Sequence, residues 1–202
     1  MDVFAHGLWA GAAAKAVNKS SGIAGKIKRP LKVWYTVLWG VFPDLLAFAL
    51  PFVWMFWNII FGDLKFSDFP RPETVEPAVR DTLPVFQIAS GLYNISHSLI
   101  VFIIIFGLAA VLLRSKLRRI PWEMSGWLLH ILIDIPTHSY KFYPTPFLWP
   151  ISEWKFDGFS WGVPWFIILN YSAIILAYWF LRRRKSKTRK LSMAILLIPL
   201  FF

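Results

Sequence analysis

The chain has 202 residues, of which 57% are hydrophobic and 18% aromatic, and its mean hydropathy is +0.54. Soluble globular domains contain about 45 to 50% apolar residues, so this composition predicts a membrane protein that forms one domain. The net charge of +11 does not predict nucleic-acid binding, because the basic runs lack the aromatic residues that stack on bases. The absence of cysteine excludes a disulfide framework and a thiolate metal site.

The basic residues gather in three clusters that flank apolar runs. Six lie between Lys15 and Lys32, four between Arg114 and Arg119, and seven between Arg182 and Lys190, out of 22 in the chain. Lys and Arg concentrate in the cytoplasmic loops of membrane proteins. The clusters therefore predict a multi-pass protein of the cell (inner) membrane whose basic loops are cytoplasmic.

The apolar runs predict an all-α fold, a polytopic membrane bundle of four to five transmembrane helices in a single domain covering residues 1–202. A span needs about 20 apolar residues. The expected spans are residues 33–61, 91–113, 122–139 and 164–181, and residues 2–18 are a fifth if that helix crosses rather than lying on the inner surface. External segments are expected at 62–90 and 140–163, whereas the 12 residues 191–202 are too few to cross.

Small and cyclic residues mark two places within these runs. Gly7 and Gly11 form a pair spaced by four residues, which lets a neighbouring helix approach closely. Pro43 interrupts the long run 33–61 and is expected to kink it, because proline cannot donate a backbone hydrogen bond. Asp44, which follows this proline, is expected near the middle of the bilayer.

The stretch Gly126–Ser139 combines an apolar frame with polar residues at helical spacing. His130 and Asp134 are four residues apart and share one helix face, and His138 follows one turn later. An imidazole beside a carboxylate in apolar surroundings fits a metal site or a proton-transfer step. It equally fits a buried structural histidine with a capping aspartate, so the rest of the chain has to decide between these interpretations.

The histidines and the remaining acidic residues favour the metal site. Seven of the eleven acidic residues lie in the two external segments, and Asp2, Asp44 and Asp134 are among the four that do not. A charge near the bilayer centre costs about 2.5 to 3.5 kcal/mol on insertion scales, so Asp44 needs a partner. None of the chain's four histidines lies in a polar loop; they are His6, His97, His130 and His138. A set rich in imidazole favours zinc over magnesium, with manganese or iron as alternatives.

Several motifs occur in order along nearly the whole chain. They are Asp2 with His6, Phe42-Pro43-Asp44, Ser96-His97-Ser98, His130 with Asp134 and His138, and the run Pro146–Pro150. Together they resemble the membrane-bound metal-dependent hydrolases of the YdjM-like type. That family is in turn thought similar to the all-helical zinc-dependent phospholipases C and single-strand nucleases.

The resemblance implies a role for each polar residue. Asp44, His97, His130 and Asp134 would form the main metal site, with Asp134 as a bridging carboxylate and His6 contributing to a second metal, which gives one to two zinc ions. Asp134 or Asp44 would position metal-activated water and take its proton during hydrolysis of a lipid or other phosphoester. Asp2 and His138 would support the ligands or act as additional ligands; Pro136, just before His138, leaves its role open.

Other interpretations remain beside the hydrolase. The aromatic segment 140–163 is typical of an interfacial belt, or it covers the site and admits a lipid-like substrate whose phosphate contacts Lys141 or Lys155. Intramembrane Asp and His residues also occur in ion-conducting, proton-conducting and transport proteins, or they hold helices together in a non-catalytic structural protein. A serine hydrolase on Ser96 or Ser98 is disfavoured, because no Gly-x-Ser-x-Gly turn accompanies them. Membrane lipids are the expected partners.

Overall fold

The computed structural model describes residues 1–20, 22–23, 27, 29–63, 65, 84–117, 119–141 and 143–183. Within these residues the chain is all-helical and contains no strand, as expected from the sequence. The helices are α1 (Val3–Lys19), α3 (Val33–Phe61), α5 (Pro84–Ser96), α6 (Leu99–Leu117), the short 3-10 helix η2 (Trp122–Met124), α7 (Ser125–Thr137) and α8 (Pro164–Arg183). Residues 191–202, the run 184–190 and most of the expected external segment 62–90 lie outside the described residues.

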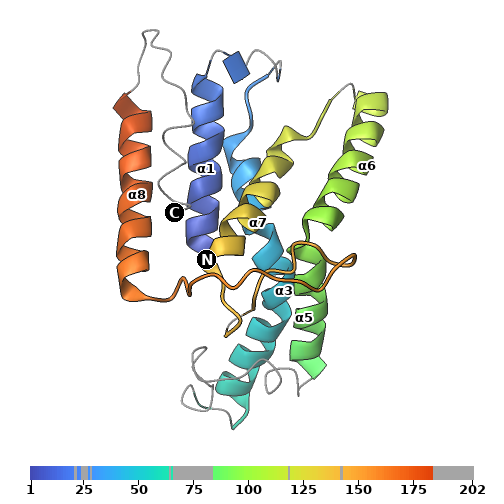
Figure 1. Ribbon diagram of the computed structural model, residues 1–202, viewed down its shortest axis with the longest axis vertical. Coiled ribbons are helices and arrows are strands. Elements are labelled where there is room, and N and C mark those ends of the chain that lie inside the picture. The colour runs from blue at the N-terminus through green and yellow to red at the C-terminus, as the bar shows by residue number, and fades with distance from the viewer. Residues whose placement is uncertain are drawn as a thin grey trace.

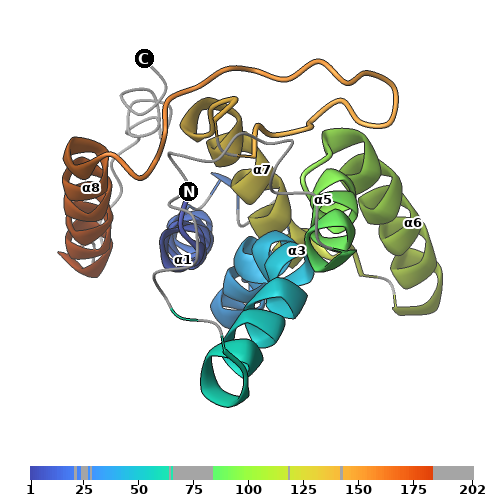
Figure 2. The ribbon, with the colours of Figure 1, turned by 90° about the horizontal axis from the view of Figure 1, so that it is seen from below.

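The helices form a bundle around three central members, α1, α3 and α7 (Figure 1). α8 lies along α1 on one side of the bundle, and α5 and α6 lie on the other side (Figure 2). α5 packs against the second half of α3, so that its last turn approaches α7 (Figure 1). This arrangement brings the middle of α3, the start of α1 and the end of α7 together.

Glycines allow the three central helices to approach closely. A Cβ atom on Gly126 of α7 would lie 2.2 Å from the carbonyl oxygen of Thr36 and 2.9 Å from the amide nitrogen of Gly40. A Cβ atom on Gly40 of α3 would in turn lie 2.6 Å from the Cβ of Ala10 on α1. The close approach predicted at Gly7 is also present, since a Cβ there would lie 3.0 Å from a side chain of α3. Small residues thus set the spacing of the centre.

Two of the described helices are long and apolar enough to cross a membrane, namely α3 with 29 residues and α8 over Pro164–Arg182. α5 and α6 meet at 63° and give a third crossing if they are counted as one broken span. α1 has 17 residues and α7 has 13, fewer than the about 20 that a span needs. The helical bundle is therefore confirmed, whereas the expected count of four to five spans is not.

The expected span 91–113 is two helices, because a new helix begins after Ser98. The Ser98 Oγ accepts hydrogen bonds from the backbone N–H groups two and three residues later, at 3.1 and 3.2 Å, and so caps the first turn of α6. The same hydroxyl donates to the carbonyl oxygen of Trp149. The chain turns at this point, and His97 lies at the corner between α5 and α6.

A long connection between α7 and α8, residues 143–163, crosses the bundle near the start of α8, away from the C-terminal ends of α1, α6 and α8, while the last part of α3 and the start of α5 extend beyond it (Figure 1). We call it the strap. One arm is bonded to the α5–α6 corner, where the N–H of Leu99 donates to the carbonyl oxygen of Phe147 at 3.0 Å. In the other arm, the N–H groups of Gly158 and Trp161 donate to carbonyl oxygens at the end of α7, at 2.9 and 3.1 Å. The strap is therefore fixed to two sides of the bundle.

Candidate metal centre

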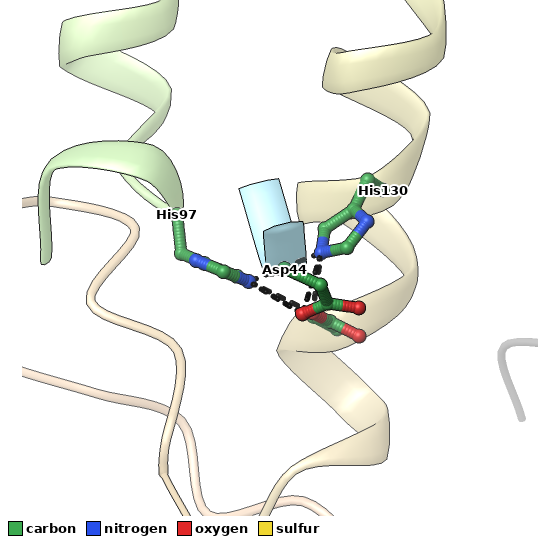
Figure 3. A group of neighbouring side chains, drawn as sticks. Asp44, His97 and His130 are labelled. Carbon is green, nitrogen blue, oxygen red and sulfur yellow. Dashed lines mark hydrogen bonds and ion pairs between the residues drawn. The ribbon is translucent and has the colours of Figure 1, made fainter. Parts of the chain in front are cut away.

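Four buried side chains converge between α3, α7 and the α5–α6 corner. Asp44 comes from the middle of α3, His97 from the corner, and His130 and Asp134 from α7 (Figure 3). One ligand-type atom from each residue lies within 4.8 Å of those of the other three. His97, His130 and Asp134 are at most 1% exposed, and Asp44 is 7% exposed. The structure thus brings together the four residues predicted to form the main metal site.

The atoms of this group are spaced like the ligands of one ion. The Nε2 atoms of His97 and His130 lie 3.0 Å apart. Asp44 Oδ1 lies 3.5 and 3.7 Å from these two nitrogens, and Asp134 Oδ2 lies 3.4 and 3.1 Å from them. In a tetrahedral zinc site with metal–ligand distances of about 2.0 Å, two ligand atoms are separated by about 3.3 Å. The observed separations are close to that value.

Backbone carbonyl groups fix the orientation of both imidazoles. His130 Nδ1 lies 2.7 Å from the carbonyl oxygen of Gly40, and His97 Nδ1 lies 3.2 Å from that of Tyr93. Because a carbonyl oxygen only accepts, His130 Nδ1 carries the ring proton and His130 Nε2 presents its lone pair. His97 Nδ1 lies closer to the Ser96 hydroxyl, at 2.9 Å, which either donates to it or accepts from it. A ring proton of His97 or a metal ion therefore lies between the two Nε2 atoms, which are 3.0 Å apart.

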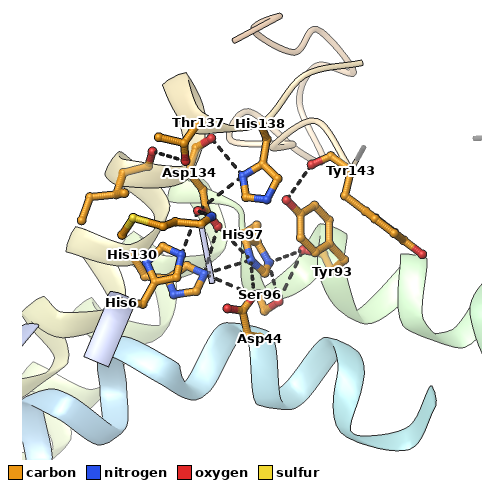
Figure 4. A network of polar contacts seen from close by, with 12 residues as sticks. His6, Asp44, Tyr93, Ser96, His97, His130, Asp134, Thr137, His138 and Tyr143 are labelled. Atoms are coloured by element: carbon orange, nitrogen blue, oxygen red, sulfur yellow. Dashed lines mark hydrogen bonds and ion pairs between the residues drawn. The ribbon is translucent and has the colours of Figure 1, made fainter. Parts of the chain in front are cut away.

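The second oxygen of Asp134 faces a different group of nitrogen atoms (Figure 4). Asp134 Oδ1 lies 2.5 Å from the amino group of Met1, 2.9 Å from His6 Nε2 and 3.4 Å from His138 Nδ1. His6 also stacks on the ring of His130, with a centroid distance of 3.6 Å. α1 therefore places His6 beside the other histidines. Asp134 lies between two groups of nitrogen atoms: its Oδ2 faces His97 and His130, and its Oδ1 faces His6 and His138.

The charges of the centre are incompletely balanced. Asp44 Oδ2 and Asp134 Oδ2 are buried and have no hydrogen-bond partner in the part of the chain that the structure describes. Neutral imidazoles add no positive charge, and the Met1 amino group offsets only one carboxylate. An uncompensated buried charge costs several kcal/mol. A divalent cation between the two Nε2 atoms would offset this cost and accept both lone pairs, so the residues fit a metal ion.

Two aromatic side chains that support the histidines had been given no role from the sequence. Tyr93 stacks on His97 with a centroid distance of 3.8 Å, and its hydroxyl donates to a carbonyl oxygen of the strap at 2.8 Å (Figure 4). Trp127 Nε1 donates to the carbonyl oxygen of Ser96 at 2.6 Å. Tyr93 precedes His97 by four residues, and this helical spacing was a usable signal. Trp127 contacts Ser96 on another helix, which spacing along the sequence does not indicate.

The remaining predicted site residues lie elsewhere. Asp2 Oδ1 accepts from the N–H of Ala5 at 3.0 Å and from the Tyr171 hydroxyl at 2.9 Å, so Asp2 caps α1 and joins it to α8. Lys141 is exposed, in contrast with the four buried ligands, and Lys155 lies on the strap and is partly exposed. A phosphate contact by either lysine stays a prediction.

Fold and site together define an all-helical membrane protein with a buried group of histidines and aspartates that is able to hold a metal ion. The model of the YdjM inner membrane protein family matches residues 1–202. The chain belongs to this family. Comparison with curated proteins and with solved structures gave no match, so the further likeness to phospholipases C and single-strand nucleases is not supported.

Proposed function

We propose that the protein is a membrane-embedded, metal-dependent hydrolase that cleaves a lipid or other phosphoester. The observation that carries the proposal is the facing pair of Nε2 atoms of His97 and His130, 3.0 Å apart in the protein interior with carboxylate oxygens beside them. Histidines and carboxylates are the ligands of hydrolytic zinc, which supplies activated water near neutral pH and positive charge for the transition state. Manganese or iron would also accept this set.

The two aspartates suit different tasks in such a reaction. Asp134 is 0% exposed and has contacts at both oxygens, which suits a ligand that holds its position. Asp44 is the most accessible of the four residues at 7%, and its Oδ2 has no hydrogen-bond partner among the described groups. We therefore assign Asp44 to orient the attacking water and to accept its proton. His97 and His130 act as neutral ligands.

Asp134 Oδ1 offers a position for a second ion. His6 Nε2 lies 2.9 Å from this oxygen. His138 Nδ1 lies 3.4 Å from it but faces the backbone carbonyl oxygen of Asp134 at 3.2 Å, so it carries its ring proton and is not a ligand in this orientation. A carboxylate that bridges two metals about 3.5 to 4 Å apart is common in phosphoester hydrolases. Fewer ligand atoms surround this second position than surround the first. We therefore infer one tightly held ion and a second, more weakly held one.

Metal analysis of the purified protein tests the centre. We expect about one to two zinc ions per chain when the protein is purified in detergent without chelator. His130→Ala and Asp134→Asn are expected to lose the bound zinc, whereas Glu153→Gln, a change at an exposed acid of the strap, is the matched control that retains it. If the unsubstituted protein binds no zinc, manganese or iron, the proposal fails and a proton relay becomes the better explanation.

Hydrolysis requires a separate measurement. The protein in vesicles of phosphatidylethanolamine and phosphatidylglycerol, and in detergent with a soluble nitrophenyl phosphodiester, is assayed for release of product. We expect activity on at least one of them, lost with a chelator and restored by zinc. Bound zinc without any hydrolysis of either substrate would leave the metal site in place and contradict the hydrolase. Loss of stability alone in the variants would instead indicate a structural role.

A further inference from the structure

The tip of the strap, residues 150–157, exposes large apolar side chains although its backbone is well fixed. Ile151 is 80% exposed, Trp154 57% and Phe156 44%. The N–H of Ile151 donates to the carbonyl oxygen of Leu148 at 3.0 Å, and the arms on both sides are bonded to the bundle. These side chains are therefore held outward by an ordered backbone. Exposed apolar groups gathered in this way indicate contact with an apolar partner.

The position of the strap relative to the helix ends indicates which partner this is. Lys19, Arg114 and Arg182 lie near the C-terminal ends of α1, α6 and α8, at the end of the bundle away from the strap (Figure 1). The strap leads directly into Pro164, where α8 begins, and α8 has 20 residues. At 1.5 Å per residue this helix is about 30 Å long, which equals the thickness of the bilayer hydrocarbon. An α8 that crosses from its basic end thus places the strap at the opposite boundary.

A second apolar surface continues beyond the strap. α3 has 29 residues, so it is about 43 Å long, and its last turns and the first turns of α5 lie on the far side of the strap from the basic ends (Figure 1). Six apolar side chains of this part of α3 are 47 to 70% exposed, namely Phe52, Val53, Phe56, Trp57, Ile60 and Phe61. If the membrane ended at the level of the strap, these six side chains would be exposed to water. The resulting apolar patch would be much larger than those on the surfaces of soluble proteins.

We propose that the strap tip is inserted among the lipids of the leaflet opposite the basic helix ends. Ile151, Trp154 and Phe156 enter the boundary of the acyl chains, where aromatic residues of membrane proteins concentrate. From Glu153 to Asp157 polar and apolar residues alternate along the tip, so that the polar side chains reach the headgroups while the apolar ones face the hydrocarbon. Because basic loops stay in the cytoplasm, this is the outer leaflet of the membrane.

Insertion of the tip determines how the metal centre is reached. The strap is bonded to the end of α7, beside Asp134 and His138, and to the corner that carries His97. With this cover in the lipid, a substrate that passes the strap comes from the bilayer, and it is an amphiphile whose phosphoester lies at headgroup level. The statement about the substrate rests on the proposed hydrolase function, whereas the position of the strap does not.

Site-directed labelling of the full chain in vesicles tests the position of the tip. The chain contains no cysteine, so one introduced cysteine can be labelled with bimane without background. The tip variants are Ile151→Cys and Phe156→Cys. Ile104→Cys, at a 56% exposed position of α6, is the reference for lipid, and Ser115→Cys, exposed at the basic end of α6, is the reference for water. Vesicles of phosphatidylethanolamine and phosphatidylglycerol carry doxyl-labelled lipid as the quencher from the membrane side.

We expect doxyl lipid to quench both tip labels nearly as strongly as the label at position 104. Iodide in the water is expected to quench them about threefold less than the label at position 115, because the apolar face of an interfacial segment is buried in the boundary between headgroups and acyl chains. Iodide quenching of both tip labels equal to that at position 115, with little quenching by doxyl lipid, would overturn the proposal. These readouts are independent of catalysis, so absence of hydrolase activity alone would leave them unchanged.

Discussion

Glu123 and Asp134 are two buried carboxylates on one stretch of chain, 2% and 0% exposed, yet their surroundings differ. Glu123, at η2, accepts two hydrogen bonds from Arg29 Nη2 at 3.1 and 3.0 Å. It also accepts from Arg119 at 3.4 Å and from the backbone N–H of Lys32 at 3.5 Å. Asp134, on α7, faces imidazoles and an amino group, and its Oδ2 has no hydrogen-bond partner among the described residues.

These different partners distinguish Glu123, a carboxylate with a structural role, from Asp134, a carboxylate that is able to bind a metal ion. Guanidinium groups are always charged, so the protein itself neutralises Glu123 and thereby joins two loops to the start of α7. The centre around Asp134 contains two carboxylates and imidazoles that are neutral when they bind metal. Burial is common to both places. What distinguishes the metal centre is the shortage of permanent positive charge.

The largest effect is expected at Asp44. Asp44→Asn removes an anionic ligand and should lower zinc affinity about 100-fold or more, measured by competition with a chromophoric chelator. In the metal-free protein the same change should leave the thermal unfolding temperature unchanged or raise it, because it removes a buried charge whose Oδ2 has no hydrogen-bond partner in the described part of the chain. Glu153→Gln is the control for both readouts. A destabilised metal-free variant would show that the centre is complete without an ion.

A smaller effect, and of the opposite kind, is expected at Glu123. Glu123→Gln leaves Arg29 and Arg119 without their carboxylate. Because these arginine side chains are 30% and 36% exposed and can be hydrated, the expected cost is about 1 to 2 kcal/mol. Unfolding in a denaturing detergent, followed by tryptophan fluorescence, measures this cost. Zinc content per folded chain should not change. If Glu123→Gln removed zinc as effectively as Asp44→Asn, the distinction between the two carboxylates would be wrong.

The distance between α7 and α3 affects both stability and the position of the metal ligands. Substitution of Gly126 tests this distance. Gly126→Ala places a Cβ 2.2 Å from the Thr36 carbonyl oxygen, which should separate α7 from α3 at a cost of about 1 to 3 kcal/mol. Because Asp44 and His130 then move apart, zinc affinity should fall about tenfold. Gly107→Ala, where a new Cβ meets nothing within 4 Å, is the matched control. Equal behaviour of the two variants would show that this contact does not position the ligands.

The smallest effect is expected at Tyr93. Tyr93→Phe removes the hydroxyl that donates to the strap, at a cost of about 0.5 to 1.5 kcal/mol. The ring still stacks on His97, so zinc content should stay unchanged. Thermal unfolding and metal analysis of the same preparation measure both quantities. Loss of zinc in this variant would instead assign the hydroxyl a direct part in holding the ligands.

Hydropathy predicted the long helices well but not the break between α5 and α6. The run 33–61 was expected and is observed as α3, because a lysine precedes it and a glycine follows it. Ser96, His97 and Ser98 interrupt the apolar run, but a few polar residues near the start of a span do not distinguish a break between two helices from one span that carries a ligand. The cap is a local bond from one hydroxyl to the following backbone N–H groups, and serines at such positions also occur inside spans.

The candidate site was predictable where polar residues are scarce. His130 and Asp134 share a helix face. An unpaired Asp44 within an apolar run would be energetically costly, so its position predicted a partner. Glu123 received no role because its partners come from loops whose meeting depends on tertiary packing. The role of His138 was left open because of Pro136; α7 continues through that proline and holds His138 Nδ1 3.4 Å from Asp134 Oδ1.

The corner at His97 also separates α6 mechanically from the ligands. α6 contacts the bundle through Phe102 and Phe106, which pack against Trp127 and Trp122. Helices adjust their tilt to bilayers of different thickness at a cost of fractions of a kcal/mol per Å. A tilt of α6 about the corner leaves His97 bonded to the carbonyl oxygen of α5. Zinc affinity should therefore be similar in short-chain and long-chain phospholipids, so that the centre tolerates changes in lipid composition.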